Sequence, residues 1–276
     1  MKAPIGIFDS GYGGLSVLEK IRETLPQYDY LYLGDNARSP YGSRSFELVY
    51  AFTLESVRAL FDMGCHLVVL ACNTASAKAL RSIQQRDLPH MGAHKRVLGV
   101  IRPTVEALGS ISESGHVGIF GTEGTILSGS YELEISKFFP ELIVSAEACP
   151  MWVPLVENNE INNIGADYFV QQHVHNIMNK DPLIDTIILA CTHYPLLIHN
   201  ILKFTAPQVR LMSQGSYVAE SLKNYLQRHP EIAYNCSEQG SCTYLTTGSA
   251  SKFSAMASLF LRQEIEAEHI DTLNYL

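Results

Sequence analysis

The sequence predicts an α/β protein in which buried parallel strands alternate with helices. Residues 5–8 and 67–71 are continuous apolar runs, short enough for strands and typical of strands covered on both faces. Residues 31–33 form a third candidate strand, and apolar residues recur at helical spacing in residues 15–25 and 46–61. The first third of the chain therefore has the order strand, helix, strand, helix, strand, as in a parallel α/β unit.

A weaker copy of this pattern occurs later in the chain. G-I-F at residues 6–8 matches G-I-F at residues 118–120, and V-L-A-C-N-T at 69–74 matches I-L-A-C-T-H at 188–193. The copies follow in the same order, at offsets of 112 residues (6 to 118) and 119 residues (72 to 191). We therefore expect two related α/β halves.

Two further strands are predicted after the second copy, at residues 209–212 and 241–247. They suggest that the chain returns to its first half. We expect a first domain made of residues 1–98 plus 208–276 and a second domain made of residues 99–207.

Composition excludes several functional classes. The 276 residues include 20 basic and 28 acidic side chains, a formal net charge of −8, and none of the longer runs is strongly basic. Nucleic acids and anionic membranes require clustered Lys and Arg, so neither is an expected partner. There is no apolar run near the roughly 20 residues of a membrane span and no signal peptide, so we expect a soluble cytoplasmic protein.

Two of the six cysteines stand where a buried strand is expected to end and a helix to begin. A thiol at a helix N-terminus faces the positive end of the helix dipole, which favours the thiolate. We expect Asn73 or Thr74 to cap the helix after Cys72, and Pro195 to lie in the first turn of the helix after Cys191. Cys72 and Cys191 are thus the candidates for a reactive base or nucleophile.

The other four cysteines are interpreted as small buried apolar residues: Cys65, Cys149, Cys236 and Cys242. Six cysteines are too few in a chain of this length for a disulfide framework, and no two of them form a C-x-x-C pair.

Polar groups that can assist a thiol stand close by in the sequence. Asp9 ends the first predicted strand, and His193 lies two residues beyond Cys191. A zinc site made of Cys72, Cys191 and His193 is an alternative, although the spacing fits no standard zinc motif.

Two loops are candidates for ligand binding. The run D-S-G-Y-G-G at residues 9–14 lacks the glycine order of a dinucleotide loop and the lysine of a P-loop, but its backbone N–H groups suit a small anion such as a carboxylate. The P-Y-G turn at residues 40–42 either closes over a ligand or is an ordinary surface turn.

Five segments together resemble the glutamate racemases of the cofactor-independent aspartate/glutamate racemase superfamily. They are G-I-F-D-S-G-Y-G-G (6–14), G-D-N-A-R-S-P-Y-G (34–42), A-C-N-T-A (71–75), V-G-I-F-G-T (117–122) with S-G-S-Y (128–131), and A-C-T-H-Y-P (190–195). They occur in the family's order and spacing.

The resemblance implies interconversion of L- and D-glutamate without cofactor or metal, to supply D-glutamate for peptidoglycan. It implies two similar domains related by pseudo-two-fold symmetry, with the active site in the cleft between them, and a homodimer. Cys72 and Cys191 correspond to the two acid/base residues, assisted by Asp9 and His193 respectively. The residues that would hold the amino acid are Asp9, Ser10, Tyr41, Gly42, Asn73, Thr74, Thr122, Thr192 and His193. Glu157 would lie near the cleft.

Three segments depart from the family pattern. Arg102-Pro-Thr104 stands where an acidic or apolar residue precedes Pro-Gly, Ser213-Gln214-Gly215 replaces Asp-Ser/Thr-Gly, and Thr247-Gly248-Ser249 replaces Thr-Gly-Asp. These departures put domain contact or regulation in doubt.

Three rival functions remain: a relative that acts on aspartate or another small substrate, a non-catalytic binding protein that retains the cleft, and a metal-dependent hydrolase.

Overall fold

The computed structural model describes residues 2–272 and contains two separate β-sheets. The first sheet consists of β1 (Ile5–Asp9), β2 (Tyr30–Gly34), β3 (Leu67–Leu70), β4 (Arg96–Gly99), β9 (Cys242–Thr246) and β10 (Ala267–His269). The second consists of β5 (His116–Gly121), β6 (Ile143–Ala148), β7 (Thr186–Ala190) and β8 (Arg210–Met212). All neighbouring strands run parallel. The predicted α/β class with mainly parallel sheets is confirmed.

Helices surround both sheets. Those on the first half are α1 (Leu15–Thr24), α2 (Phe46–Asp62), α3 (Asn73–Lys78), α4 (Leu80–Ser82), the π-helical turn η1 (Ile83–Asp87), α5 (Leu88–Met91), α12 (Gly215–Arg228), α13 (Pro230–Ala233) and α14 (Ala250–Leu261). Those on the second half are α7 (Glu123–Leu127), α8 (Ser130–Phe138), α9 (Trp152–Glu157), α10 (Ile164–Lys180), the 3₁₀ turn η3 (Tyr194–Leu197) and α11 (Ile198–Leu202). The connection from β4 to β5 carries α6 (Ile101–Glu106) and the 3₁₀ turn η2 (Leu108–Ser110).

The two sheets share one strand order. The first sheet runs β10-β9-β2-β1-β3-β4 and the second runs β6-β5-β7-β8. Leaving out the added edge strands β9 and β10, each order is second, first, third, fourth. The repeated G-I-F lies in β1 and β5, and the repeated L-A-C begins in β3 and β7, so the sequence repeat marks equivalent strands in two related halves.

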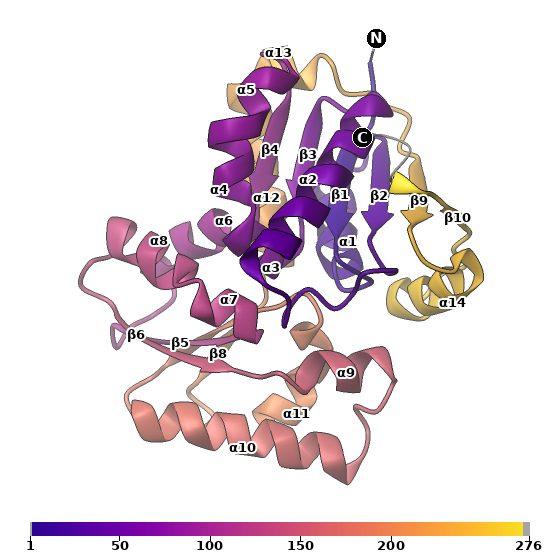
Figure 1. The fold of residues 1–276 in the computed structure, drawn as a ribbon. Coiled ribbons are helices and arrows are strands. Elements are labelled where there is room, and N and C mark those ends of the chain that lie inside the picture. The colour runs from indigo at the N-terminus through magenta and orange to yellow at the C-terminus, as the bar shows by residue number, and fades with distance from the viewer. Residues whose placement is uncertain (1, 273–276) are drawn as a thin grey trace.

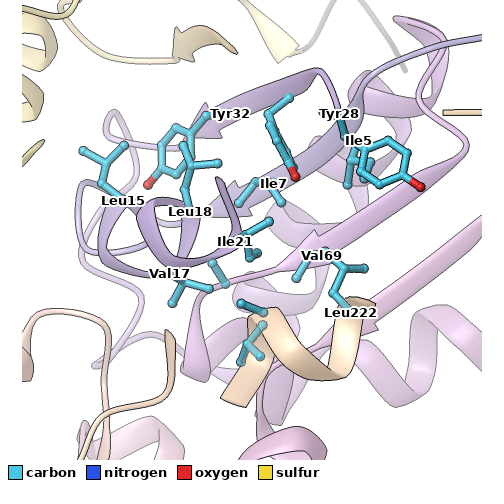
Figure 2. Packing of buried hydrophobic residues seen from close by; sticks show 14 of the residues in the cluster. Ile5, Ile7, Leu15, Val17, Leu18, Ile21, Tyr28, Tyr32, Val69 and Leu222 are labelled. Atoms are coloured by element: carbon cyan, nitrogen blue, oxygen red, sulfur yellow. The ribbon is translucent and has the colours of Figure 1, made fainter. Parts of the chain in front are cut away.

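The predicted strands and helices of the first third are present with small shifts at their ends. Every residue of β1 and of β7 is buried, as expected of continuous apolar runs covered on both faces. Figure 2 shows how α1 covers one face of the first sheet, with Leu18 and Ile21 packed near Ile7 and Val69. Leu222 of α12 joins the same cluster, so a helix from the end of the chain completes this core.

The chain passes between the halves twice, through α6 and between β8 and α12. In Figure 1 the second half lies below the first, with α3 and α7 facing each other between them. The strand predicted at 209–212 pairs with β7 and so belongs to the second sheet, whereas β9 pairs with β2 in the first. The domain boundaries near residues 98 and 207 stay predictions.

Two expectations about the cysteine-flanking helices were wrong. Cys72 itself caps α3, because its sulfur accepts a hydrogen bond from the Ala75 N–H at 3.5 Å, and neither Asn73 nor Thr74 caps it. After Cys191 the chain first forms the 3₁₀ turn η3, with Pro195 in its first turn, and α11 starts only at Ile198. Cys191 therefore does not stand at the start of an α-helix.

Candidate active site

The candidate residues gather where each parallel sheet changes direction. In a strand order of second, first, third, fourth, a crevice opens at the carboxyl ends of the first and third strands. In the first half these are β1, which ends at Asp9 and is followed by Ser10, and β3, which is followed by Ala71 and Cys72. In the second half they are β5, followed by Thr122, and β7, followed by Cys191. The two crevices face each other across the interface between the halves.

The Cys72 thiol is enclosed by polar groups of the first half. Its sulfur lies 3.4 Å from Ser10 Oγ and accepts the Ala75 N–H. Burial raises the pKa of Cys72 to about 12, with a further contribution from the Asp9 carboxylate, while Ser10 and the Ala75 N–H act in the opposite direction. Cys72 is therefore a protonated thiol at neutral pH. Cys191 raises the pKa of Cys72 further, as the smallest of these contributions.

Cys191 is paired with an imidazole. Its sulfur lies 3.9 Å from His193 Nδ1, and the other ring nitrogen, Nε2, lies 3.2 Å from Glu157 Oε1. Burial opposes protonation of the ring, but Cys191 and Glu157 outweigh it and raise the pKa of His193 to about 10. The structure thus places a protonated imidazole ring next to the Cys191 sulfur.

Asp9 lies at the centre of the arrangement and is completely buried. One carboxylate oxygen accepts the Gly11 N–H at 2.9 Å, and the other accepts the Thr192 hydroxyl at 3.4 Å. Burial raises the pKa of Asp9, although His193 and the backbone N–H of Gly11 oppose the rise. The charge of Asp9 raises the pKa of Cys72. Its hydrogen bonds to Gly11 and Thr192 connect the loop after β1 to the loop after β7.

A second set of contacts closes the two halves on each other. Thr74 Oγ1 lies 2.9 Å from Thr122 Oγ1 and 3.3 Å from Thr125 Oγ1. Thr122 also caps α7, accepting the Thr125 N–H. Gly42 packs against this cap: its carbonyl accepts the Gly124 N–H at 2.7 Å, and a Cβ at Gly42 would lie 2.8 Å from that of Thr122. The P-Y-G turn is therefore part of the contact between the halves and not an ordinary surface turn.

Two predicted ligand-binding side chains are turned to other partners. The hydroxyl of Tyr41 donates to the buried carboxylate of Asp35, which also binds Arg38. The Asn73 amide donates to Gln214 Oε1 at 2.5 Å, and its oxygen accepts from Tyr131 at 2.7 Å. Both side chains are therefore engaged in hydrogen bonds with other groups of the protein.

Sequence reasoning did not assign roles to several residues that the structure brings to the site. Gln214 and Thr104 lie within departures from the family pattern, and Tyr131 lies in the S-G-S-Y segment, so each had a signal in the sequence. The other departures have local partners: Arg102 pairs with Glu106 on the surface at 2.8 Å, and Ser249 caps α14.

A cavity of about 410 Å³ lies behind Cys191. Cys191, Thr192, Ser16 and Gln214 line it, but Cys72, Asp9 and Ser10 do not. The cavity is therefore distinct from the space between the sulfurs, which a substrate has to occupy if both thiols act on it.

No metal-ligand cluster is formed by the part of the chain that the structure describes: over residues 2–272, no three His, Cys, Asp or Glu side chains are grouped so as to hold an ion. Within the same residues, no helix combines the length and apolar character needed to cross a membrane.

The sequence matches the family described as Asp/Glu/Hydantoin racemase over residues 5–215. The chain belongs to this racemase family. It is 42% identical over 274 residues to a glutamate racemase of Ruegeria sp. (strain TM1040), which is 96% of this chain and 98% of that protein.

Solved racemase structures share the whole fold. A glutamate racemase isoform from Bacillus anthracis matches with a TM-score of 0.88 at 35% identity, over 98% of this chain and 97% of that one. A glutamate racemase from Francisella tularensis, solved in complex with D-glutamate, matches with a TM-score of 0.87 at 28% identity, over 99% of both chains. The racemase fold therefore extends over nearly the full length of this chain.

Proposed function

We propose that this racemase interconverts L- and D-glutamate by a two-base mechanism in which Cys72 and Cys191 act on opposite faces of the α-carbon. The observation that carries the proposal is the placement of the two buried thiols after equivalent strands, β3 and β7, of two related halves that face each other. Two related halves in this arrangement present equivalent groups to opposite sides of one ligand.

In the reaction from L-glutamate, Cys191 is the base and Cys72 is the acid. The Cys191 thiolate, stabilised by His193, removes the α-proton and becomes a thiol. The Cys72 thiol, whose pKa is about 12, delivers its proton to the opposite face and becomes a thiolate. The product is D-glutamate, and the enzyme is left ready for the reverse reaction. Cys72 thus acts on D-glutamate and Cys191 on L-glutamate.

The intermediate carries carbanion charge, which the site has to stabilise with fixed donors and little water. We assign substrate binding to the polar groups around the two sulfurs: Asp9, Ser10, Tyr41, Gly42, Asn73, Thr74, Thr122, Thr192 and His193. The side chains of Ser10, Thr74, Thr122 and Thr192 are all buried, so hydroxyl donors are available away from bulk water. Tyr41, Gly42 and Asn73 contribute backbone groups and shape.

We assign positioning roles to Asp9 and Glu157. Asp9 holds the loop after β1 against Thr192, and its charge keeps Cys72 protonated. Glu157 faces the outer nitrogen of His193 and keeps the ring charged beside Cys191. In this scheme no cofactor or metal takes part.

In the cell, we propose that the product D-glutamate supplies peptidoglycan synthesis, that the protein works in the cytoplasm, and that it forms a homodimer. The role in peptidoglycan synthesis is tested by expressing this chain in a D-glutamate auxotroph, which should then grow without added D-glutamate. Sedimentation of the purified protein tests the last.

The deciding experiment follows the optical rotation of pure L-glutamate with the purified chain and no added cofactor. We expect the rotation to fall to zero. In deuterated water, deuterium should enter the α-carbon from either enantiomer, and its absence from the product would rule out exchange through two bases.

Parallel reactions separate the rival functions. Loss of rotation with L-aspartate but not with L-glutamate would favour the relative that acts on another substrate. Binding of glutamate without any racemisation would favour the non-catalytic protein, and activity that follows added metal would favour a hydrolase.

A further inference from the structure

We propose that Gln214 and Thr104 form a coupled pair that positions the first turn of α3, and with it the Cys72 thiol, at the point where the chain passes between its two halves. Gln214 is a positioning residue in this scheme and does not touch the substrate. The inference rests on the proposed two-cysteine racemisation.

Gln214 is buried, with only 3% of its surface exposed, and its amide is fully engaged. Its oxygen accepts the Asn73 amide N–H at 2.5 Å. Its nitrogen lies within hydrogen-bond distance of three oxygens, those of Asn73 (3.1 Å), Thr104 (3.0 Å) and Tyr131 (2.5 Å). No other type of side chain of this length offers both a neutral acceptor and two donors.

The partners come from different parts of the fold. Asn73 is the first residue of α3, and Tyr131 belongs to α8 of the second half. Thr104 lies in α6, on the first passage of the chain between the halves, and Gln214 directly precedes α12, on the second passage. One buried amide therefore connects both passages to the helix that follows Cys72.

Gln214 is connected to Cys72 through a single residue, Asn73. Cys72 is the cap of α3 and its sulfur accepts the Ala75 N–H, so the thiol position depends on the geometry of residues 72–75. Asn73 belongs to this turn, and its side chain hydrogen-bonds to Gln214 and Tyr131. A change at Gln214 that frees Asn73 allows the turn to shift, and an error of about 1 Å at a reacting group costs about 100-fold in rate.

Thr104 and Gln214 contact each other directly. The 3.0 Å hydrogen bond between them needs both residues at once. Thr104 is anchored in turn because its hydroxyl donates to the Val100 carbonyl at 2.7 Å. Because they share this hydrogen bond, the two residues should be coupled energetically.

The test compares Gln214→Leu with Gln227→Leu, which makes the same chemical change at an exposed position of α12. Releasing the Asn73 side chain lets the turn that carries Cys72 shift, so kcat/KM for glutamate should fall about tenfold in Gln214→Leu. Gln227→Leu should leave it unchanged. Because L- and D-glutamate are equally stable, kcat/KM falls equally in both directions, so rates alone do not locate the defect.

Isotope effects locate it. If the Cys72 step has become slower, the primary isotope effect on kcat/KM should rise with α-deuterated D-glutamate and fall with α-deuterated L-glutamate. A smaller fraction of folded enzyme would leave both isotope effects at their wild-type values, and that result would overturn the proposal.

Thr104→Val keeps the shape of the side chain and removes the acceptor, so it serves if Gln214→Leu does not fold. It should shift the isotope effects in the same directions by a smaller amount. In the double variant the loss in kcat/KM should be smaller than the product of the two single losses, and an effect equal to that product would contradict the coupling.

The wild-type enzyme separates the proposed function from the role of Gln214. Its failure to racemise glutamate would reject the proposed function. Racemisation by the wild type with unchanged isotope effects in the variants would reject only the role of Gln214.

Discussion

The two ring nitrogens of His193 face two different functional groups. Nε2, the nitrogen farther from Cys191, lies 3.2 Å from Glu157 Oε1. The inner nitrogen, Nδ1, lies 3.9 Å from the Cys191 sulfur. Cys191 and Glu157 both raise the pKa of His193, so the ring is protonated on both nitrogens at neutral pH. The second half thus places a protonated ring beside Cys191, although Cys191 does not begin an α-helix.

Glu157→Gln should move the alkaline limb of the pH profile. In the proposed mechanism the protonated form of His193 assists Cys191, and this form is lost as the pH rises through the His193 pKa of about 10. Removing the Glu157 charge lowers that pKa, so kcat/KM should begin to fall at lower pH than in the wild type. Glu160→Gln, an exposed carboxylate three residues away, should not move the limb. An unchanged limb in Glu157→Gln would mean that Glu157 does not act on the ring.

Cys72→Ala and Cys191→Ala should each lower kcat for glutamate by about 1,000-fold or more, since each removes one of two proton-transfer groups. Cys65→Ala is the matched control, because Cys65 is a buried thiol in the core of the first half. It should lower the stability while kcat stays near the wild-type value. Circular dichroism of the glutamate solution measures all three, and full activity in either active-site variant would contradict the two-base mechanism.

Much of the fold could be predicted because the strands are buried on both faces. Continuous apolar runs at β1, β3 and β7 are visible in the sequence, and the repeated G-I-F and L-A-C mark equivalent strands. The ends of strands also locate Asp9, Cys72 and Cys191, because functional groups of parallel sheets gather at carboxyl ends.

Side-chain direction and long-range pairing could not be predicted in this way. Tyr41 is in the predicted turn, but its hydroxyl points to Asp35, which depends on the buried charge of Asp35 and Arg38. Gln214 and Asn73 are hydrogen-bonded although they lie 141 residues apart in the sequence, and no local sequence pattern predicts such a contact. The cap at Cys72 was missed because thiols are not among the usual capping residues, which are Ser, Thr, Asp and Asn.

Gly13→Ala should separate the loops that follow β1 and β7. A Cβ at Gly13 would lie 2.3 Å from Thr192 Oγ1 and 2.6 Å from His193 Nδ1, so the neighbouring loop has to move. Because His193 supports Cys191, we expect kcat/KM for glutamate to fall about 100-fold. Gly165→Ala, in the first turn of α10, has its nearest neighbour at 3.2 Å and should have no effect on activity. Equal activities of the two variants would show that the loop contact does not matter for catalysis.

Arg38→Met should destabilise the fold and displace the turn that carries Tyr41. Arg38 donates to Asp35 at 2.7 Å and to Glu55 at 2.9 Å, and both carboxylates are buried. Removing the cation leaves them unpaired, so the free energy of unfolding should fall by about 3–5 kcal/mol. Arg102→Met removes an arginine from a surface pair with Glu106 and should cost about 0–1 kcal/mol. Urea unfolding measures both values, and similar losses in the two variants would show that the cluster around Arg38 is no more important for stability than an exposed ion pair.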